Sequence, residues 1–130
     1  MSADYGCRNH KAYGVKVVPD TVRMVGTTGG ATNTVTFSIY DFDGNEINDL
    51  IAVHLWPSVT AGGVVNAVTS VAATAPALIL DATKTGMVHA LVKHGSVVTY
   101  NADGAEAALF ANISSSEGRV FSSNTMVFES

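Results

Sequence analysis

The chain has 130 residues and a mass of 13.5 kDa, a length that supports one hydrophobic core rather than two. Hydrophobic residues make up 47% of it and charged residues 14%, a balance that excludes intrinsic disorder. The net charge of −4 argues against a general nucleic-acid surface. No apolar run is long enough for a membrane span or a secretory leader, so we expect synthesis in the cytoplasm and no membrane partner.

Composition favours extended structure. The chain holds 18 Val and 13 Thr, whereas the long polar residues that populate exposed helix faces are scarce. We therefore predict an all-β protein. A mean hydropathy of +0.26 in so small a chain indicates either a very well filled core or apolar surface that a partner covers.

Charge divides the chain into two parts. The first 23 residues have a net charge of +2, from four basic and two acidic side chains: Arg8, Lys11, Lys16, Arg23, Asp4 and Asp20. The remainder has a net charge of −6, from three basic and nine acidic side chains. The glycine-rich stretch 26–30 lies near the change, which predicts an N-terminal arm and linker over 1–30 and one domain over 31–130.

A strand is predicted from Thr34 onward, because Val35, Phe37 and Ile39 alternate with polar residues. It ends at the turn residues 43–45, where Gly44 supplies a positive φ.

The next alternating run is 52–56, which Pro57 is expected to stop. We expect this run to pair with the preceding strand across their short connection. Residues 58–77 lack polar patterning and are predicted to form a long loop with one short strand.

Four later strands are predicted at 87–92, 96–100, 106–113 and 120–128, separated by glycine-containing turns. Short strands at this spacing are typical of an antiparallel immunoglobulin-like β-sandwich, which we expect to have seven to nine strands. Trp56 is given a core role in the third strand. The predicted core comprises Val35, Phe37, Ile39, Leu55, Leu109 and Val127.

Four segments resemble immunoglobulin-like modules of bacteria and tailed phages. They are TVTFSIYDFDGNE from Thr34, VHLW from Val53, LVKHGSVVTYNADG from Leu91 and EGRVF from Glu117. The likeness covers residues 32–128 and consists mainly of turn and core positions. It supports the fold more strongly than any one role.

Such modules are common in tailed-phage virions, so the resemblance implies a viral structural protein. The role expected from it is a capsid decoration, or cement, protein on the outer capsid surface of the virion. Its partner would be the major capsid protein, with self-association on the capsid as a further expectation. The alternatives are a tail, baseplate or fibre component and a carbohydrate-binding or adhesion module.

The basic arm is the predicted capsid-docking segment, since it would be drawn to an acidic partner. Its docking residues are Arg8, Lys11, Tyr13, Lys16 and Arg23. Two valine-rich segments, 15–18 and 22–25, would add pairing with a sheet edge. In the alternative interpretation they form the first strand of the sandwich itself.

No cofactor or metal is expected. Asp41, Asp43 and Asn45 alternate as in a calcium loop, but Gly44 and Ala52 stand where that loop requires other spacing and a bidentate glutamate. The spacing of the four histidines does not indicate a metal site, and the single cysteine, Cys7, allows no disulfide within the chain.

An enzyme is not expected either, because no nucleophile-elbow, zinc-protease or phosphate-loop motif occurs. For the carbohydrate-binding alternative, the candidate aromatic residues are Trp56, Tyr40 and Tyr100.

Overall fold

A computed structural model describes residues 18–66, 68, 70–84, 87–102, 107–115 and 118–128. These residues form strands and connections, and none of them lies in a helix that could cross a membrane. The strands are β1 (Thr21–Gly26), β2 (Thr32–Tyr40), β3 (Ile51–Ser58), β4 (Ser70–Thr74), β5 (Leu78–Lys84), β6 (Met87–Val92), β7 (Val97–Asn101), β8 (Ala107–Ser114) and β9 (Val120–Phe128).

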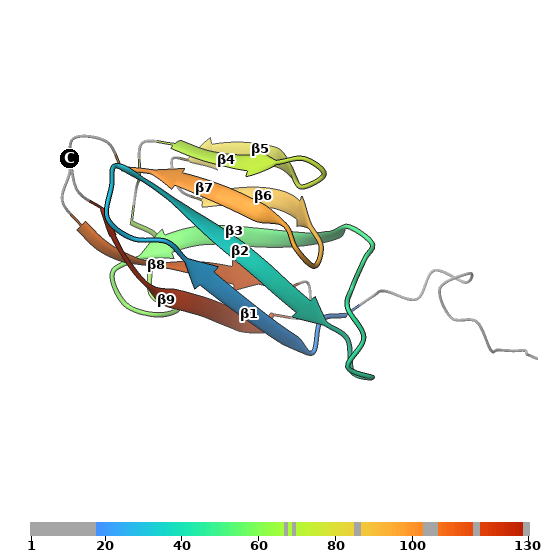
Figure 1. Ribbon diagram of the computed structural model, residues 1–130. Coiled ribbons are helices and arrows are strands. Elements are labelled where there is room, and N and C mark those ends of the chain that lie inside the picture. Colours follow the sequence, from blue (N-terminus) through green and yellow to red (C-terminus); the bar gives the residue numbers. More distant parts are fainter. Residues whose placement is uncertain are drawn as a thin grey trace, which may run out of the picture.

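The strands form two antiparallel sheets packed face to face, which confirms the predicted all-β sandwich (Figure 1). One sheet has the order β1-β2-β7-β4 and the other the order β5-β6-β3-β8-β9. At one side of the sandwich β4 lies beside β5, and at the other side β1 lies beside β9 (Figure 1).

The spatial order of the strands is that of a variable-type immunoglobulin domain, whose sheets hold A-B-E-D and C″-C′-C-F-G. The path of the chain differs between the third strand and the E position. After β3 the chain crosses to β4 in the D position, returns to β5 and β6 in the C″ and C′ positions, and then enters β7. The architecture is therefore immunoglobulin-like, whereas the connections of its middle strands are not.

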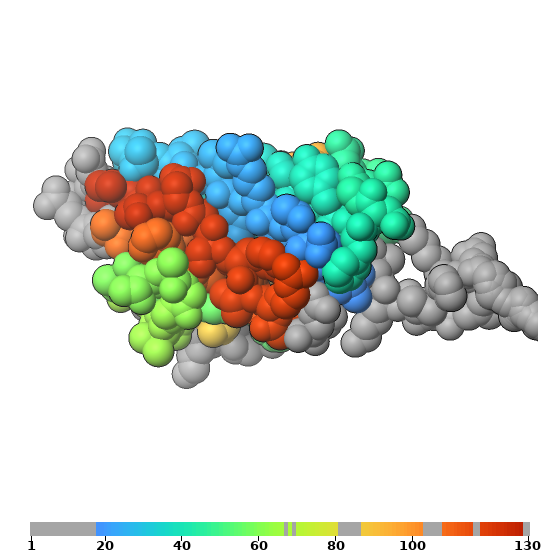
Figure 2. Space-filling model, turned by 90° about the horizontal axis from the view of Figure 1, so that it is seen from below, coloured from blue at the N-terminus to red at the C-terminus, as the bar shows by residue number. Residues whose placement is uncertain are grey.

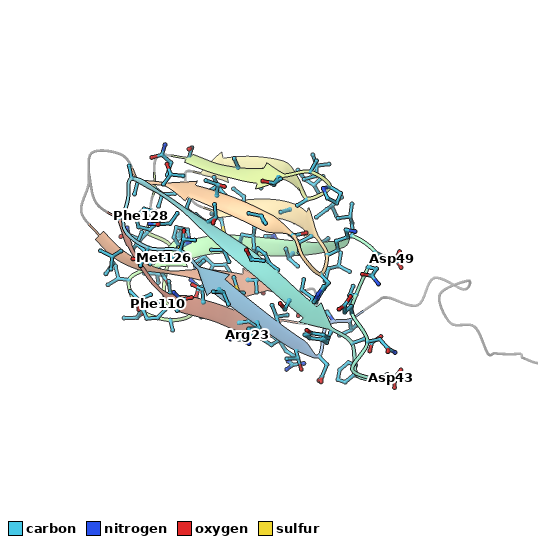
Figure 3. The ribbon with its side chains drawn as sticks, viewed as in Figure 1. Arg23, Asp43, Asp49, Phe110, Met126 and Phe128 are labelled. Carbon is cyan, nitrogen blue, oxygen red and sulfur yellow. The ribbon has the colours of Figure 1, made fainter. Side chains whose placement is uncertain are left out.

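The core lies between the sheets and follows the period of two. Val35, Phe37 and Ile39 are buried on β2, as predicted, and so are Leu55 and Leu109. The predicted burial of Val127 is wrong: it is 41% exposed. Its neighbours Met126 and Phe128 point into the core, so the alternation of β9 turns Val127 outward (Figure 3).

β1 belongs to the sandwich. It pairs with β2 along its whole length, and Val22 and Met24 are buried. The glycine-rich stretch 26–30 is the β1–β2 hairpin, in which Gly29 adopts a φ of 100°. The sandwich therefore begins before residue 31, and the interpretation of the second valine-rich segment as a strand is confirmed for 21–26. Residues 15–17 lie outside the described part of the chain.

Two predictions about β3 are wrong. Pro57 lies inside β3, in register with Ala111 of β8. Its carbonyl accepts a hydrogen bond from the Asn66 N–H at 2.8 Å, so its ring nitrogen faces the loop side, where no strand needs a donor. β2 and β3 are also not paired, because they lie in opposite sheets.

Candidate docking face

The two sheets differ in what they present to solvent. The exposed positions of the four-stranded sheet are mainly threonine and serine, as expected of a sheet with one solvated face. The five strands of the other sheet contain only two charged residues, Asp81 and Lys84, and both lie on the edge strand β5. We call the outward surface of this five-stranded sheet the docking face.

The first row of the docking face is aliphatic. Leu78 of β5, Leu91 of β6 and Ala52 of β3 lie opposite one another in the strand register. Leu78 is 51% exposed and Ala52 is also exposed, because Ile79, Ala90 and Val53 take the inward positions beside them. Apolar side chains therefore stand on both sides of the sheet.

The second row brings two histidines together. His89 of β6 lies opposite His54 of β3, and their rings stack with centroids 4.5 Å apart and an interplanar angle of 1°. Asp81 is the register partner of His89 on β5, and Ser114 is that of His54 on β8. Sequence spacing missed this pair because antiparallel pairing joins residues that are remote along the chain.

The loop that follows β3, residues 59–66, covers another part of the docking face, around β3 and β8. Asn112 of β8 points outward, yet it is fully buried, because the loop lies over it. Its side-chain amide is hydrogen-bonded on both sides. Its Oδ1 accepts from the Gly62 N–H at 2.8 Å and from the Ser122 hydroxyl at 2.7 Å. Its Nδ2 donates to the Trp56 carbonyl at 3.0 Å and to the Ser58 hydroxyl at 2.7 Å.

Trp56 is the second residue that holds this loop against the sheet. Its indole N–H donates to the Gly63 carbonyl at 2.8 Å, so its ring lies on the docking face and not in the predicted core role. Figure 2 shows the loop (green) against β8 and β9 (orange to red). Three of its side chains remain largely uncovered: Val59, Val64 and Val65, at 62%, 89% and 42% exposure.

The chain thus covers the outward side of Trp56 and Asn112 with its own loop and leaves the β5-β6-β3 half uncovered. We call the uncovered part the open half. Its described side chains are Ala52, His54, Leu78, Met87, His89 and Leu91. Two charged residues of the edge strand β5 stand in register with this set, Asp81 with His89 and Lys84 with Met87, so the open half is apolar mainly on β3 and β6.

Acidic residues gather elsewhere, at the end of the sandwich formed by the β2–β3 connection, where Asp43 and Asp49 are labelled in Figure 3. The connection folds as the predicted turn: Gly44 has a φ of 82°, and the Asp41 carboxylate accepts hydrogen bonds from the N–H groups of Asp43 and Asn45, both at 2.9 Å. Within the described residues, no three His, Cys, Asp or Glu side chains are placed to hold a metal ion.

His94 fastens this acidic end to the sheet. Its Nδ1 accepts a hydrogen bond from the Ile39 N–H at 3.1 Å, which leaves Nε2 as the protonated nitrogen, 3.4 Å from the Glu46 carboxylate. Its ring also meets the Tyr40 ring edge-on at 5.2 Å. His94 therefore has a structural role.

The predicted capsid-docking residues fall into two groups. Arg8, Lys11, Tyr13 and Lys16 lie outside the described residues. Arg23 lies on β1, opposite Ser38, with its side chain exposed on the outer face of the four-stranded sheet. The structure therefore places Arg23 on a different sheet from the docking face.

The carbohydrate-binding alternative loses one of its three aromatic candidates. Tyr100 is fully buried in the core, and its hydroxyl has no hydrogen-bond partner among the described residues. Tyr40 and Trp56 are each half-buried and each engaged, with His94 and Gly63 respectively. No rim of exposed aromatic rings forms from these three residues.

Comparison with protein-family models, with curated proteins and with solved structures found no match to this chain. The class defined by the structure is an immunoglobulin-like β-sandwich. The resemblance to phage modules rests on the sequence motifs alone.

Proposed function

We propose that this chain is a non-enzymatic structural protein of a tailed-phage virion, a decoration protein that binds the outer surface of the head. There it would stabilise the contacts between major capsid subunits. The observation that carries the proposal is the open half of the docking face, a largely apolar surface on a sheet whose other face already packs the core.

Burial of this surface would be favourable. Antiparallel sheets that work in isolation carry polar side chains on their solvated face, as the four-stranded sheet does here. Removing apolar surface from water contributes about 25 cal/mol per Å². A small sandwich with one such face is suited to an assembly, in which a neighbouring protein covers it.

The anchor in this proposal is the basic arm. The Asp20 N–H donates to the Tyr40 carbonyl at 2.8 Å, so the chain enters the sandwich beside the acidic end. An arm of opposite sign that precedes this point gives the protein a charge polarity, with the arm drawn to an acidic capsid surface and the acidic end held away from it.

Quantitative mass spectrometry of purified virions tests the role. A copy number comparable to that of the major capsid protein is expected for decoration. A few copies per particle would contradict decoration and assign the chain to a tail, baseplate or fibre, and absence from particles would contradict a virion role altogether.

The arm is tested by deleting residues 1–17, a deletion that leaves β1 intact because β1 begins at Thr21. The shortened protein is expected to stay folded and to lose binding to undecorated heads. A charge-reversed arm, with Arg8, Lys11 and Lys16 replaced by glutamate, should behave in the same way, whereas Lys93→Glu is the control outside the arm. Unchanged binding of both arm variants would contradict the anchor.

A further inference from the structure

We propose that His54 and His89 together bind one divalent transition-metal ion of the kind that prefers imidazole ligands, such as Zn²⁺. The two side chains lie opposite each other in the register of β3 and β6, on the outward side of the five-stranded sheet. Spacing along the chain did not indicate this pair, because the strand register brings the two residues together. The inference does not depend on the proposed function, since it concerns the protein in isolation.

Both rings have nitrogens available to a ligand. Within the part of the chain that the structure describes, neither His54 nor His89 makes a hydrogen bond or an ion pair, and each ring stacks on the other. His94 differs, since its Nδ1 accepts from the Ile39 N–H and its Nε2 faces the Glu46 carboxylate. A neutral imidazole has one nitrogen with a lone pair, which is the group that binds Zn²⁺, Cu²⁺ or Ni²⁺. The pair therefore offers two such nitrogens side by side.

The distance between the two rings suits a shared ion. Zn–N bonds are about 2.0–2.1 Å long, so the two nitrogens must come within about 4.2 Å of each other. The ring centroids are 4.5 Å apart, but the ring planes are parallel within 1°, and an imidazole binds a metal in the plane of its ring. The torsion about the Cβ–Cγ bond of histidine is soft. Because His54 is exposed and His89 half-buried, both rings can turn their edges toward one point above the sheet without movement of the backbone.

The neighbouring charges favour a cation at this place. Asp81 is the register partner of His89 on β5, whereas Lys84 stands opposite Met87, one row further along the sheet. The acidic residue is therefore the nearer of the two in register, and the chain as a whole has a net charge of −4. Calcium and magnesium are not the expected ions, because both require a shell of oxygen ligands.

The proposed site has two protein ligands and is therefore an open one. Among the described residues, no three His, Cys, Asp or Glu side chains are placed around a single ion. Structural zinc sites have four protein ligands and catalytic zinc sites three. With two, water fills the remaining positions and the ion exchanges with the solution, so the fold does not require it.

The test is isothermal titration of the full chain at neutral pH with Zn²⁺, and with Ca²⁺ as the control ion. The variants are His54→Ala and His89→Ala, and the matched control is His10→Ala, which removes a histidine outside the described residues. His54 and His89 both stand outside the core, so both variants should fold, which circular dichroism checks.

The expected result is Zn²⁺ binding by wild type and by His10→Ala, and no binding of Ca²⁺. His54→Ala and His89→Ala should each weaken Zn²⁺ binding at least about tenfold, since even the loss of a hydrogen-bond partner of a metal ligand weakens metal sites about 10- to 100-fold. In NMR spectra of wild type, Zn²⁺ should shift the imidazole signals of His54 and His89 together, a measurement that needs no variant.

A wild-type protein that binds no Zn²⁺ would overturn the proposal. So would an effect of one of the two histidine variants without the other, because the ion is shared. Loss of binding in His10→Ala with unchanged binding in His54→Ala and His89→Ala would also overturn it and would assign the ion to the N-terminal arm.

Discussion

The side chain of Asn124 pairs with Gly26 as a neighbouring strand would. Its Oδ1 accepts from the Gly26 N–H at 2.8 Å and its Nδ2 donates to the Gly26 carbonyl at 3.0 Å. The approach is close, because a Cβ on Gly26 would lie 2.6 Å from the Met126 Cγ. This amide joins β1 to β9, which Figure 2 shows side by side in blue and red, and the hydrogen bonds of Thr28 and Gly29 to Val127 continue the seam beyond the end of β1.

Replacing Asn124 with alanine should lower the free energy of unfolding by about 1 to 2 kcal/mol, since two main-chain groups lose their partners. Amide exchange at Gly26 should accelerate, which hydrogen exchange followed by NMR would detect. Thr125→Ala is the control, because Thr125 is exposed on the same strand. Equal exchange rates at Gly26 in Asn124→Ala and wild type would contradict this account of the seam.

Replacing Asn112 with alanine should release the loop 59–66, which covers part of the docking face. Four hydrogen bonds of 3.0 Å or less meet on its buried amide, so a loss of about 2 to 4 kcal/mol is expected. Trp56 is the single tryptophan of the chain and contacts this loop, so its fluorescence should shift toward that of a solvated indole. Ser122→Ala removes one of the bonds and should give a smaller change. An unchanged emission spectrum in Asn112→Ala would show that the loop does not need this amide.

Tyr100 should make the protein less stable at high pH. Burial raises the pKa of its hydroxyl well above the ordinary tyrosine value of about 10. Above pH 10 the unfolded chain therefore releases the Tyr100 proton while the folded protein keeps it, and the free energy of unfolding falls by up to about 1.4 kcal/mol per pH unit. Below pH 10 both states hold the proton and this contribution is constant.

Denaturant melts of Tyr100→Phe between pH 8 and pH 11 test this behaviour. The variant should lose less stability with rising pH than wild type, and at neutral pH it should be at least as stable, because the hydroxyl has no partner among the described residues. Tyr40→Phe, at a half-buried ring, is the matched control. Parallel pH profiles for Tyr100→Phe and wild type would count against the buried hydroxyl as the cause.

Core packing is tested by a pair of truncations on opposite sides of the alternation. Phe37→Ala should cost about 3 to 5 kcal/mol, because its ring is 1% exposed between the sheets. Val127→Ala should cost less than about 1 kcal/mol, since Val127 faces outward on β9. A large loss for Val127→Ala and a small one for Phe37→Ala would reverse the assignment of the buried faces.

Sequence periodicity predicted the strands whose two faces differ in polarity. β2 alternates between apolar and small polar residues, so its inward side chains were identifiable. β5 escaped prediction because its apolar residues, such as Leu78, stand on the outer face as well as the inner one. The prediction that Pro57 ends its strand was wrong for a related reason. A proline interrupts a strand only where a neighbouring strand would need the missing N–H as a hydrogen-bond donor, and which strands are neighbours depends on the fold.

The sequence indicated the docking face only through the high mean hydropathy of the chain, which does not say where an apolar surface lies. Its location depends on which strands join the second sheet, and β3 was expected to pair with β2 instead. The stacking of His54 on His89 likewise follows from the β3–β6 register, which no local pattern encodes. The predicted basic docking residues remain predictions, apart from the placement of Arg23 on the other sheet.

The measurement that tests the central claim most directly is hydroxyl-radical footprinting of two samples. One is the free protein in dilute solution, and the other is the protein in its assembled state. The claim is that another protein covers the open half of the docking face when this protein is part of an assembly. Labelling of Met87, His89 and Leu91 should fall on assembly, while Phe42, which is 67% exposed at the far acidic end, should be labelled as before. Unchanged labelling of Met87, His89 and Leu91 in the assembled state would contradict the claim.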